Sequence, residues 1–491
     1  MENKKKPLHN DSNHKLKSRR DFLSQGLMAS AASMLLPFNA FGQTECEMAS
    51  MVAIDNPMIP VIVIDLAGGA NIGGSNALVG NTNGQMHFLP SYQSLGLMTS
   101  EHPSNVGMIS DLRGNTTAPT GLLFHSQSGM LAGIRAAAGT AVNNTDGIVM
   151  CGISGDDTEN NPHNPMYWFF NAGARGQLTQ LVGSRANTSG GNSQAPVTSI
   201  DLSIAPLRVS TPTDVTDLAS LGPMSRGTNF AVGRESMLMR ALEGLSSSKV
   251  RSLSRRGLPD AVKDLVLCNI TKTQALLNKF SSEELNPALD TNVQAVFPEV
   301  LLTNPNEAQA VQRQAGSIAK MVLDGYAACG TITMGGYDYH GNDRVETDRR
   351  DTVAGNTIGR ILNLAQRKNT KVVIYVLSDG GVSANGTDIA TNGRFSWSSD
   401  SGNRGASLML VYDPMARPVM RSNLRQMGNF QTSGSVQSDA SPMSNSVTTL
   451  AKAVMLNYLA LHGREGELAQ VVGDNPFLTD LNRHLLFGKI A

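Results

Sequence analysis

Residues 331–340 read Thr-Ile-Thr-Met-Gly-Gly-Tyr-Asp-Tyr-His, a short apolar run that ends in two glycines and an Asp-x-His pair. The β-branched residues and the glycines after them predict a strand over 331–336. Because residues i and i+2 of an extended segment point to the same side, Asp338 and His340 would face one space at the strand's end. Taken alone, the pair is most simply explained as a polar surface turn. A carboxylate and an imidazole are nevertheless a usable pair of metal ligands.

Further strands are expected on both sides of this segment. Residues 60–66 read Pro-Val-Ile-Val-Ile-Asp-Leu, the uninterrupted apolar run typical of a strand buried on both faces of a parallel sheet. Residues 371–377 form the clearest strand of the chain, and shorter ones are predicted at 147–151 and 406–412.

Helical patterns alternate with these strands. The expected helices span 121–138, 166–174, 231–246, 259–280, 305–327, 344–367, 447–462 and a short stretch within 477–486. Residues 382–405 and 422–444 are rich in Gly, Asn and Ser and are expected to be loops. The alternation predicts an α/β fold, a three-layer sandwich with a mostly parallel central sheet and a helical insertion at about 231–328.

The first 42 residues have the pattern of an export signal. Arg19 and Arg20 follow a lysine-rich region and precede a modestly apolar stretch from Leu27 to Phe38. Residues 40–42 (Ala-Phe-Gly) then offer a signal peptidase small residues, so we expect a twin-arginine signal peptide over 1–42 and a mature domain over 43–491. This predicts a partner, the twin-arginine export machinery, and a periplasmic or extracellular location. The apolar stretch is too short for a comfortable membrane span, and no later segment approaches one.

Charge and cysteine content narrow the function classes. The whole chain has 40 basic and 40 acidic residues, and removing 1–42 leaves 33 basic and 37 acidic residues, a formal charge of −4. No basic stripe remains to suggest nucleic acid or a membrane surface as partner. The four cysteines allow three complete disulfide pairings in an oxidising compartment, and their wide spacing excludes a C-x-x-C zinc site.

Polar residues gather where the predicted strands end, which is where open α/β sheets keep their ligands. The candidates are Asp65 and Asn71 after the first strand, His163 at a helix start, Asp338 and His340, Asp379 after 371–377, and Asp400 before 406–412. Each has a simple structural explanation by itself, but their joint placement favours a site. Such oxygen-rich sets with an imidazole suit a divalent metal, namely zinc, manganese or calcium.

These segments resemble a bacterial, twin-arginine-exported family of unassigned function within the alkaline-phosphatase/sulfatase-like superfamily. The most specific match is residues 335–340, Gly-Gly-Tyr-Asp-Tyr-His, which is close to the family's Gly-Gly-Trp-Asp-Thr-His. Residues 63–71 resemble its opening strand and glycine pair, and 162–164 resemble its Ser-His-Phe segment. Residues 376–381 resemble its Ser-Glu-Phe-Gly-Arg strand end, and 399–411 its Thr-Asp-His-Gly turn and next strand. The resemblance covers nearly the whole mature chain, weakly over 180–300, and implies an alkaline-phosphatase-like fold.

The chain departs from this family at positions that matter for catalysis. Asn71 stands where the family has aspartate, Pro162 where it has a serine able to act as nucleophile or ligand, and Ser401 where it has histidine. Superfamily hydrolases use one or two metals to stabilise an ester oxyanion beside a nucleophile.

Two functions follow from the matches and the departures. The first is a degenerate or non-hydrolytic exported protein that binds a small-molecule or envelope ligand. The second is a metal-dependent phosphate or sulfate ester hydrolase that uses a metal-activated water. In the hydrolase, Asp338, His340 and Asp379 would hold the metal and Asn71 and Asp400 would support it. The binding protein would keep a residual metal site or none. His163 and Asp65 are the candidate ligand-binding residues. The lost charges favour the first reading.

Overall fold

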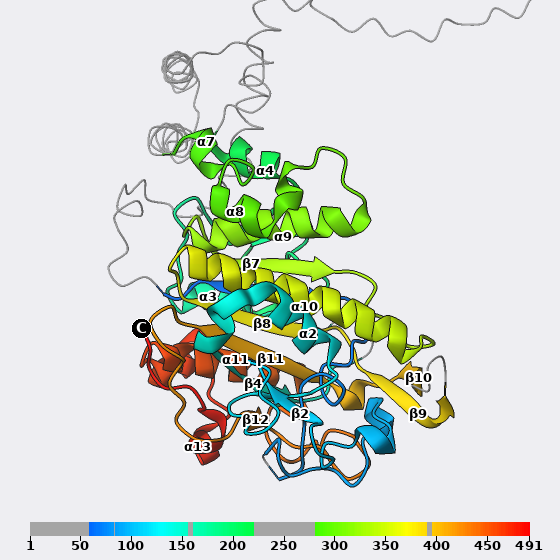
Figure 1. Ribbon diagram of the computed structural model, residues 1–491. Helices are drawn as coiled ribbons and strands as arrows, with labels where there is room; N and C mark the ends of the chain where they lie inside the picture. Colours follow the sequence, from blue (N-terminus) through cyan, green and yellow to red (C-terminus); the bar gives the residue numbers. More distant parts are fainter. Residues whose placement is uncertain (1–57, 83, 156–160, 220–279, 390–394) are drawn as a thin grey trace, which may run out of the picture.

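The computed structural model describes residues 58–82, 84–155, 161–219, 280–389 and 395–491 (Figure 1). Its centre is a sheet with the strand order β12-β4-β11-β8-β1-β7-β5-β6. The strands are β1 (Val61–Leu66), β4 (Thr145–Cys151), β5 (Thr179–Gly183), β6 (Leu207–Arg208), β7 (Ala327–Met334), β8 (Val372–Ser378), β11 (Ala406–Tyr412) and β12 (Gln426–Met427). Only β11 runs antiparallel to its two neighbours in this sheet, β4 and β8.

Helices cover both faces of the sheet, which explains why its central strands are apolar throughout. On β1, Ile62 and Ile64 belong to the core beneath α2 (Gly129–Ala138), α9 (Glu307–Leu323) and α10 (Arg344–Arg367). Val61 and Val63 point to the opposite face and pack with α3 (Met166–Asn171) and α11 (Val447–Leu461). Figure 1 shows α2 and α10 side by side across one face of the sheet, where they contact each other. The fold is therefore mixed α/β in three layers, as the sequence predicts.

The long helices begin at polar residues that cap them. The Asp343 side chain accepts a hydrogen bond from the Glu346 N–H at the start of α10, and Asn306 and Ser446 cap α9 and α11 in the same way. Shorter helices complete the described fold: α4 (Pro212–Thr216), α7 (Ser282–Leu285), α8 (Thr291–Val296), α12 (Leu468–Val472) and α13 (Leu481–His484).

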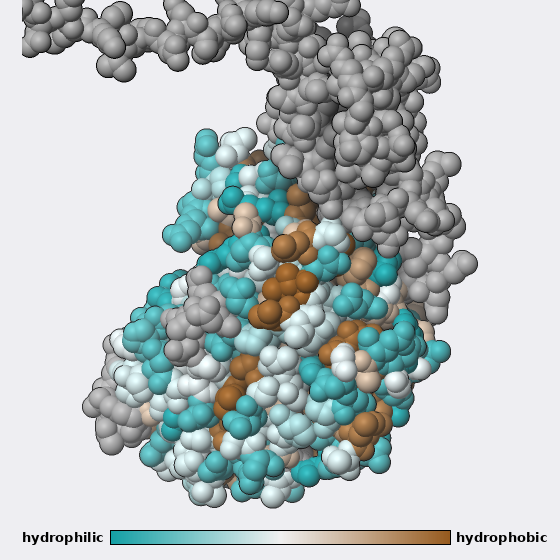
Figure 2. Space-filling model, turned by 180° about the vertical axis from the view of Figure 1, so that it is seen from behind, coloured by the Kyte–Doolittle hydropathy of each residue, from teal (hydrophilic) through white to brown (hydrophobic). Residues whose placement is uncertain are grey.

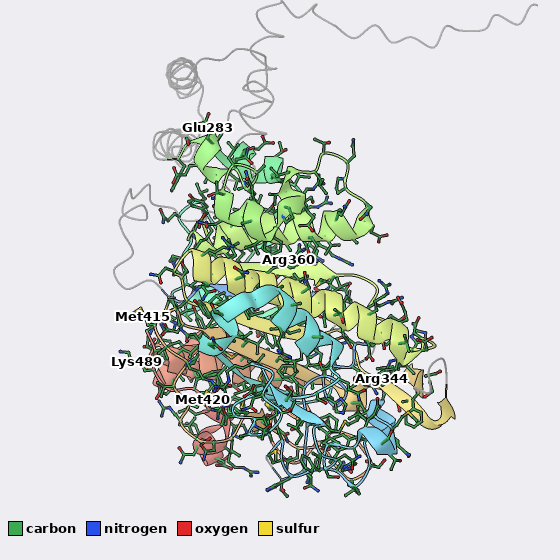
Figure 3. The ribbon with its side chains drawn as sticks, viewed as in Figure 1. Glu283, Arg344, Arg360, Met415, Met420 and Lys489 are labelled. Atoms are coloured by element: carbon green, nitrogen blue, oxygen red, sulfur yellow. The ribbon has the colours of Figure 1, made fainter. Side chains whose placement is uncertain are left out.

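The start of α10 is also fixed by a buried charge. Arg344 donates to the Gly96 carbonyl oxygen and to the Glu101 carboxylate, each at 2.6 Å. Figure 3 shows Arg344 at the end of α10 that lies near the hairpin of β9 (Val382–Ile389) and β10 (Phe395–Asp400). Because breaking a buried ion pair is costly, this contact holds the helix end in place.

Two predicted elements are wrong. The expected helix 121–138 begins with strand β3 (Leu123–His125), which pairs with β2 (Ile109–Asp111), and only Gly129–Ala138 is helical. The expected loop 382–405 contains an antiparallel hairpin of β9 (Val382–Ile389) and β10 (Phe395–Asp400). Burial explains the second error, because the Phe395 and Trp397 side chains enter the core and anchor an otherwise polar segment.

Several predictions fall on residues that the structure does not describe. The signal peptide and the helix 231–246 lie outside the described residues, as does 259–280 except for Phe280. The helical insertion as a whole therefore stays a prediction, although its last helix, α9, is confirmed. In the part of the chain that the structure describes, no helix is both long enough and apolar enough to cross a membrane.

The two described cysteines are free thiols. Cys151 and Cys329 are buried and belong to the cores on opposite faces of the sheet. Three strands, β11, β8 and β1, lie between β4 and β7 in the sheet order, so the two cysteines cannot pair with each other without rebuilding the sheet. Figure 2 shows that exposed apolar side chains on the back of the molecule lie in small groups between polar surface.

Candidate metal centre

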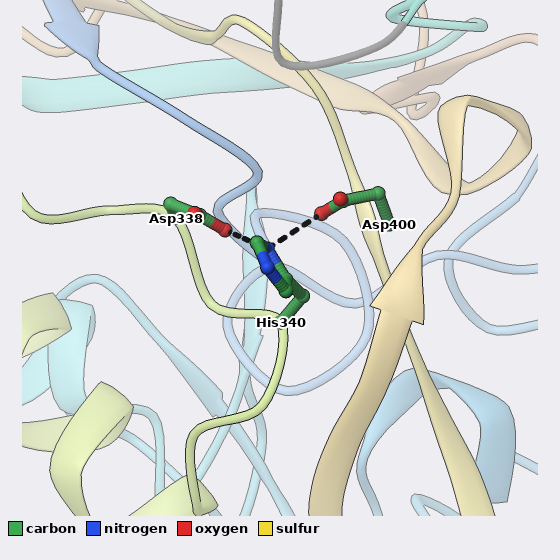
Figure 4. Close-up of side chains that lie close together, drawn as sticks. All are labelled: Asp338, His340 and Asp400. Carbon is green, nitrogen blue, oxygen red and sulfur yellow. Dashed lines mark hydrogen bonds and ion pairs between the residues drawn. The ribbon is translucent and has the colours of Figure 1, made fainter.

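Three of the predicted ligands meet at one edge of the sheet. The Nδ1 atom of His340 contacts an Asp338 carboxylate oxygen and lies 3.2 Å from Oδ1 of Asp400 (Figure 4). One donor atom from each residue lies within 4.8 Å of the other two. The side chains of Asp338, His340 and Asp400 are 40, 48 and 42 % exposed, so the cluster is open to solvent.

The direction of the strands explains this meeting. Asp338 and His340 follow the carboxyl end of β7, whereas Asp400 ends β10 and precedes β11. Because β11 is antiparallel to β8, its first residues lie at the same edge as the last residues of β8, β1 and β7. Asp400, which precedes β11, therefore lies beside Asp338 and His340, which follow β7.

A glycine pair forms the floor of the cluster. Gly68 has φ +116°, and a Cβ atom there would lie 2.4 Å from the backbone nitrogen of Asp338. A Cβ atom on Gly69 would lie 3.0 Å from the Gly381 carbonyl oxygen and 3.5 Å from Oδ1 of Asp400. The backbone after β1 can approach both acidic residues only because it lacks side chains there.

Buried aromatic rings join the two segments that carry the ligands. Tyr339, between Asp338 and His340, is fully buried and stacks on Trp397 of β10 with ring centroids 6.5 Å apart and an interplanar angle of 27°. The Tyr339 hydroxyl donates to Oδ1 of Asp351 at 2.8 Å, and the Trp397 indole N–H donates to the Thr347 hydroxyl at 2.8 Å. Both rings are therefore tied to α10.

Backbone hydrogen bonds reinforce this junction. The Gly341 N–H donates to the Trp397 carbonyl oxygen and the Trp397 N–H to the Asn342 carbonyl oxygen, both at 2.9 Å. The Asn342 side chain also donates to the Asp338 carbonyl oxygen at 3.2 Å. The Asp-x-His segment and β10 thus form one framework, which fixes the spacing of the three ligands.

Asp379 and Asp65 do not belong to the group of three. Both are buried in the same polar layer beneath the strand ends. The Asn161 and Asn192 side-chain amides donate to the two oxygens of Asp379 at 2.8 and 3.0 Å. The Asn192 and Ser193 backbone N–H groups donate to Asp65. These donors stabilise both carboxylates in their buried positions.

Burial dominates the ionisation of Asp65. Desolvation raises the pKa of this carboxyl group to about 6, against the lowering effect of the Ser193 and Asn192 N–H groups, and nearby Asp379 raises it further. The pair thus resembles a buried acid cluster that is stabilised by neutral donors.

His163 is buried close to the Asp379 loop. Its Nε2 atom lies 2.8 Å from the Ser154 hydroxyl, which donates to the Ser378 carbonyl oxygen and accepts from the Gly380 N–H. Since that hydroxyl proton is committed, Nε2 of His163 is assigned as the donor. Desolvation lowers the pKa of His163 to about 4, and its Nδ1 atom has no partner among the described residues.

Asn71 lies in a different buried network. Its amide nitrogen donates to the Ser75 hydroxyl and to the Leu95 carbonyl oxygen, while Oδ1 has no partner among the described residues. Asn76 links the network to α10, because its amide donates to the Asn71 carbonyl oxygen and to Asp351. Asn71 is therefore connected with Asp351, which anchors Tyr339, and among the described residues no hydrogen bond joins Asn71 to the three ligands.

The sequence did not predict the residues that form hydrogen bonds to Asp379 or those that hold the metal-ligand segments together. Asn161 and Asn192 lie in polar loops without a recognisable pattern, so nothing in the sequence connects them to Asp379. The role of Trp397 has one weak signal, namely the alternation of Phe395 and Trp397 with polar residues in an otherwise polar stretch just before Asp400.

The donor set fits a divalent cation. Two carboxylates and one imidazole are common ligands of zinc, and three protein ligands with an open position are typical of catalytic zinc sites. Manganese accepts the same donors, whereas calcium prefers six to eight oxygens. In the structure, the Nδ1 atom of His340 lies against carboxylate oxygens on two sides, a position where either a proton or a cation would balance their charge.

In comparisons with known proteins, no family model matches this chain, and no curated protein matches it. A functional assignment therefore depends on the geometry of the site.

Proposed function

We propose that this chain is an exported envelope protein of alkaline-phosphatase-like fold that binds one divalent cation and, through it, a ligand or envelope partner that it does not hydrolyse. The observation that supports this proposal is the convergence of Asp338, His340 and Asp400 at an exposed edge of the sheet. The twin-arginine pattern of Arg19 and Arg20 supports the export step.

The two positions at which a nucleophile would be expected, Pro162 and Ser154, favour binding over hydrolysis. Pro162 stands where the resembling family has serine, and proline can neither attack an ester nor ligate a metal. Ser154 contacts an imidazole, as a nucleophile would, but both residues are buried and the hydroxyl is fully engaged. Asp65 and Asp379 are buried and already accept hydrogen bonds from N–H groups, whereas Asp338, His340 and Asp400 are exposed, which favours one cation position rather than two.

A second candidate is a metal-dependent phosphate or sulfate ester hydrolase. The exposure of all three ligands favours it, because solvent can reach the cation position and complete its coordination. When bound, such a cation would supply Lewis-acid chemistry and lower the pKa of water. The protein's own residues would then only have to hold the cation and leave one side of it open.

Metal analysis and ester assays test the proposal. We expect the purified mature protein to bind one equivalent of zinc or manganese in titration calorimetry, and Asp338→Asn to weaken this by at least about tenfold, which corresponds to roughly 1.4 kcal/mol. Asp474→Asn is the matched control, since Asp474 is a 57 % exposed aspartate paired with Lys452 on the surface.

The same preparations distinguish the two candidates. Aryl phosphates and aryl sulfates should not be turned over by the cation-loaded protein. Turnover that disappears in Asp338→Asn would replace the binding function by the hydrolase. A wild-type protein that binds neither cation would refute both.

A further inference from the structure

Ser441 and His484 form a hydrogen-bonded pair outside the candidate metal centre. The Ser441 hydroxyl lies 2.6 Å from Nε2 of His484. Ser441 belongs to the loop before α11, and His484 is the last residue of α13. The Asn457 amide of α11 donates to the His484 carbonyl oxygen at 2.7 Å and lies 3.9 Å from the sulfur of Met427 on β12, so the pair lies near this edge strand. Figure 1 shows α13 well apart from β9 and β10, the hairpin that carries Asp400.

The hydrogen bonds of His484 define its tautomer. Nδ1 lies 2.8 Å from the Asp480 carbonyl oxygen, which can only accept, so Nδ1 carries a proton. Desolvation lowers the pKa of His484 below its ordinary value of 6.5, against the raising effect of Asp480 and with a smaller lowering effect of Arg483, so the ring is neutral at pH 7. In this neutral ring Nε2 is the acceptor, and the Ser441 hydroxyl donates its proton to it.

The buried pair of Ser154 and His163 has the opposite arrangement. There the serine hydroxyl donates to the Ser378 carbonyl oxygen, so Nε2 of His163 donates to the serine and cannot remove its proton. The Ser441 hydroxyl has no acceptor other than His484 among the described residues. Of the two pairs, Ser441 and His484 have the polarity that a nucleophile and its base require.

The pair lies just beneath the surface. Ser441 is 6 % and His484 is 5 % exposed, so both keep contact with solvent. The side chains of Asp480 and Arg483, which pair with each other, are 43 and 45 % exposed. The Phe477 ring packs against the imidazole with centroids 4.8 Å apart. Because little of the pair reaches solvent and an aromatic ring lies on it, a substrate group that contacts it must be small and uncharged.

We propose that Ser441 is a nucleophile for small, uncharged carboxylic esters, with His484 as its general base and the Asp480 carbonyl group orienting that base. Oγ of Ser441 forms a bond to the ester carbonyl carbon while Nε2 of His484 takes the hydroxyl proton. This proton passes to the departing alcohol, and water then hydrolyses the acyl-serine to the carboxylic acid and the free hydroxyl. The Met443 backbone N–H points at Oγ from 3.4 Å, a long contact, and can donate to an oxyanion that forms beside it. This activity is additional to the proposed cation binding and uses no residue of the cation site.

Serine-directed labelling of the mature protein in the presence of EDTA tests this role. Phenylmethanesulfonyl fluoride forms a bond between its sulfur and an activated serine oxygen and releases fluoride, and peptide mapping by mass spectrometry identifies the serine. We expect modification of Ser441 and none of Ser154. His484→Gln should slow the labelling on the order of a hundredfold, as expected for the loss of a general base. Ser438→Ala, at an exposed serine of the same loop, is the matched control and should label at the wild-type rate.

Hydrolysis of para-nitrophenyl acetate gives a second readout. Turnover should be lost in Ser441→Ala and kept in Ser438→Ala, and it should fall as the pH is lowered through the His484 pKa, because a protonated imidazole accepts no proton. A wild type whose Ser441 stays unmodified, labelling that is equally fast in His484→Gln, or turnover that persists in Ser441→Ala overturns the inference and leaves the pair as a structural hydrogen bond. The cation titration involves none of these residues, so failure of one proposal is distinguishable from failure of the other.

Discussion

Replacing Gly68 by alanine should destabilise the protein and displace Asp338 in the candidate metal site. The new Cβ atom would lie 2.4, 2.6 and 2.8 Å from the backbone nitrogen, Cα and Cβ of Asp338, so a metal ligand and its backbone must move. At φ +116° an L-residue is also strained, which costs about 1–2 kcal/mol. Overpacking of this kind adds about 1–3 kcal/mol. We therefore expect a loss of roughly 2–5 kcal/mol in the free energy of unfolding.

Gly335→Ala is the matched control in the neighbouring loop. A Cβ atom at Gly335 has no atom within 4 Å, and its φ lies outside the range that disfavours side chains. This substitution should be neutral or stabilise the protein by up to about 1 kcal/mol. Urea unfolding of the cation-free proteins measures stability, and calorimetric titration with zinc or manganese measures the site.

The displacement of Asp338 should also weaken cation binding by at least about tenfold in Gly68→Ala. Equal stability and cation affinity in Gly68→Ala and wild type would contradict the contact between the glycine floor and the ligand. So would a Gly335→Ala protein that is damaged as much as Gly68→Ala.

Three further substitutions or treatments test other parts of the structure. Trp397→Phe keeps the stacked ring but loses the indole donor, so it should cost about 1 kcal/mol of stability and weaken cation binding. The control Trp168→Phe, on the opposite face of the sheet, should leave cation affinity unchanged. Calorimetric titration measures the cation affinity of both variants. Burial raises the pKa of Asp65 from 3.8 in the unfolded chain to about 6 in the folded protein, so its contribution to stability is complete below pH 3.8 and is lost as the pH rises through 6. Asp65→Asn should remove that part of the pH profile, on the order of 2–3 kcal/mol in urea unfolding between pH 4 and 7, and an unchanged profile would refute it. Cys151 and Cys329 should resist thiol reagents until the protein unfolds, which peptide mapping detects, and rapid labelling of the native protein would contradict their burial.

The sequence predicts the layered fold well because its central strands are encoded locally. Uninterrupted apolar runs such as those of β1 and β8 can only be strands covered on both faces, and polar residues cap the long helices. The β9–β10 hairpin escapes such reasoning, because only the tertiary burial of Phe395 and Trp397 distinguishes it from a polar loop.

The site is predictable only where its residues flank predicted strands. Asp338 and His340 follow one such strand and Asp400 precedes another, and the structure brings the three together. Asp379 also follows a predicted strand, but it is buried and accepts hydrogen bonds from Asn161 and Asn192, which come from distant loops. The local sequence predicts where a residue lies along a strand, but it does not predict which donors from distant loops will form hydrogen bonds to its carboxylate.

The antiparallel direction of β11 allows the β8–β11 connection to vary in sequence without a change in the sheet. Both ends of this connection, Ser378 and Ala406, lie on adjacent strands at the same edge of the sheet, so the chain leaves and returns without crossing the core. Such an excursion tolerates substitution at its exposed positions, provided that Phe395 and Trp397 stay in the core. Asp400 is one of these exposed positions, so a single substitution in this hairpin could add or remove one of the three candidate ligands while the sheet beneath it is unchanged.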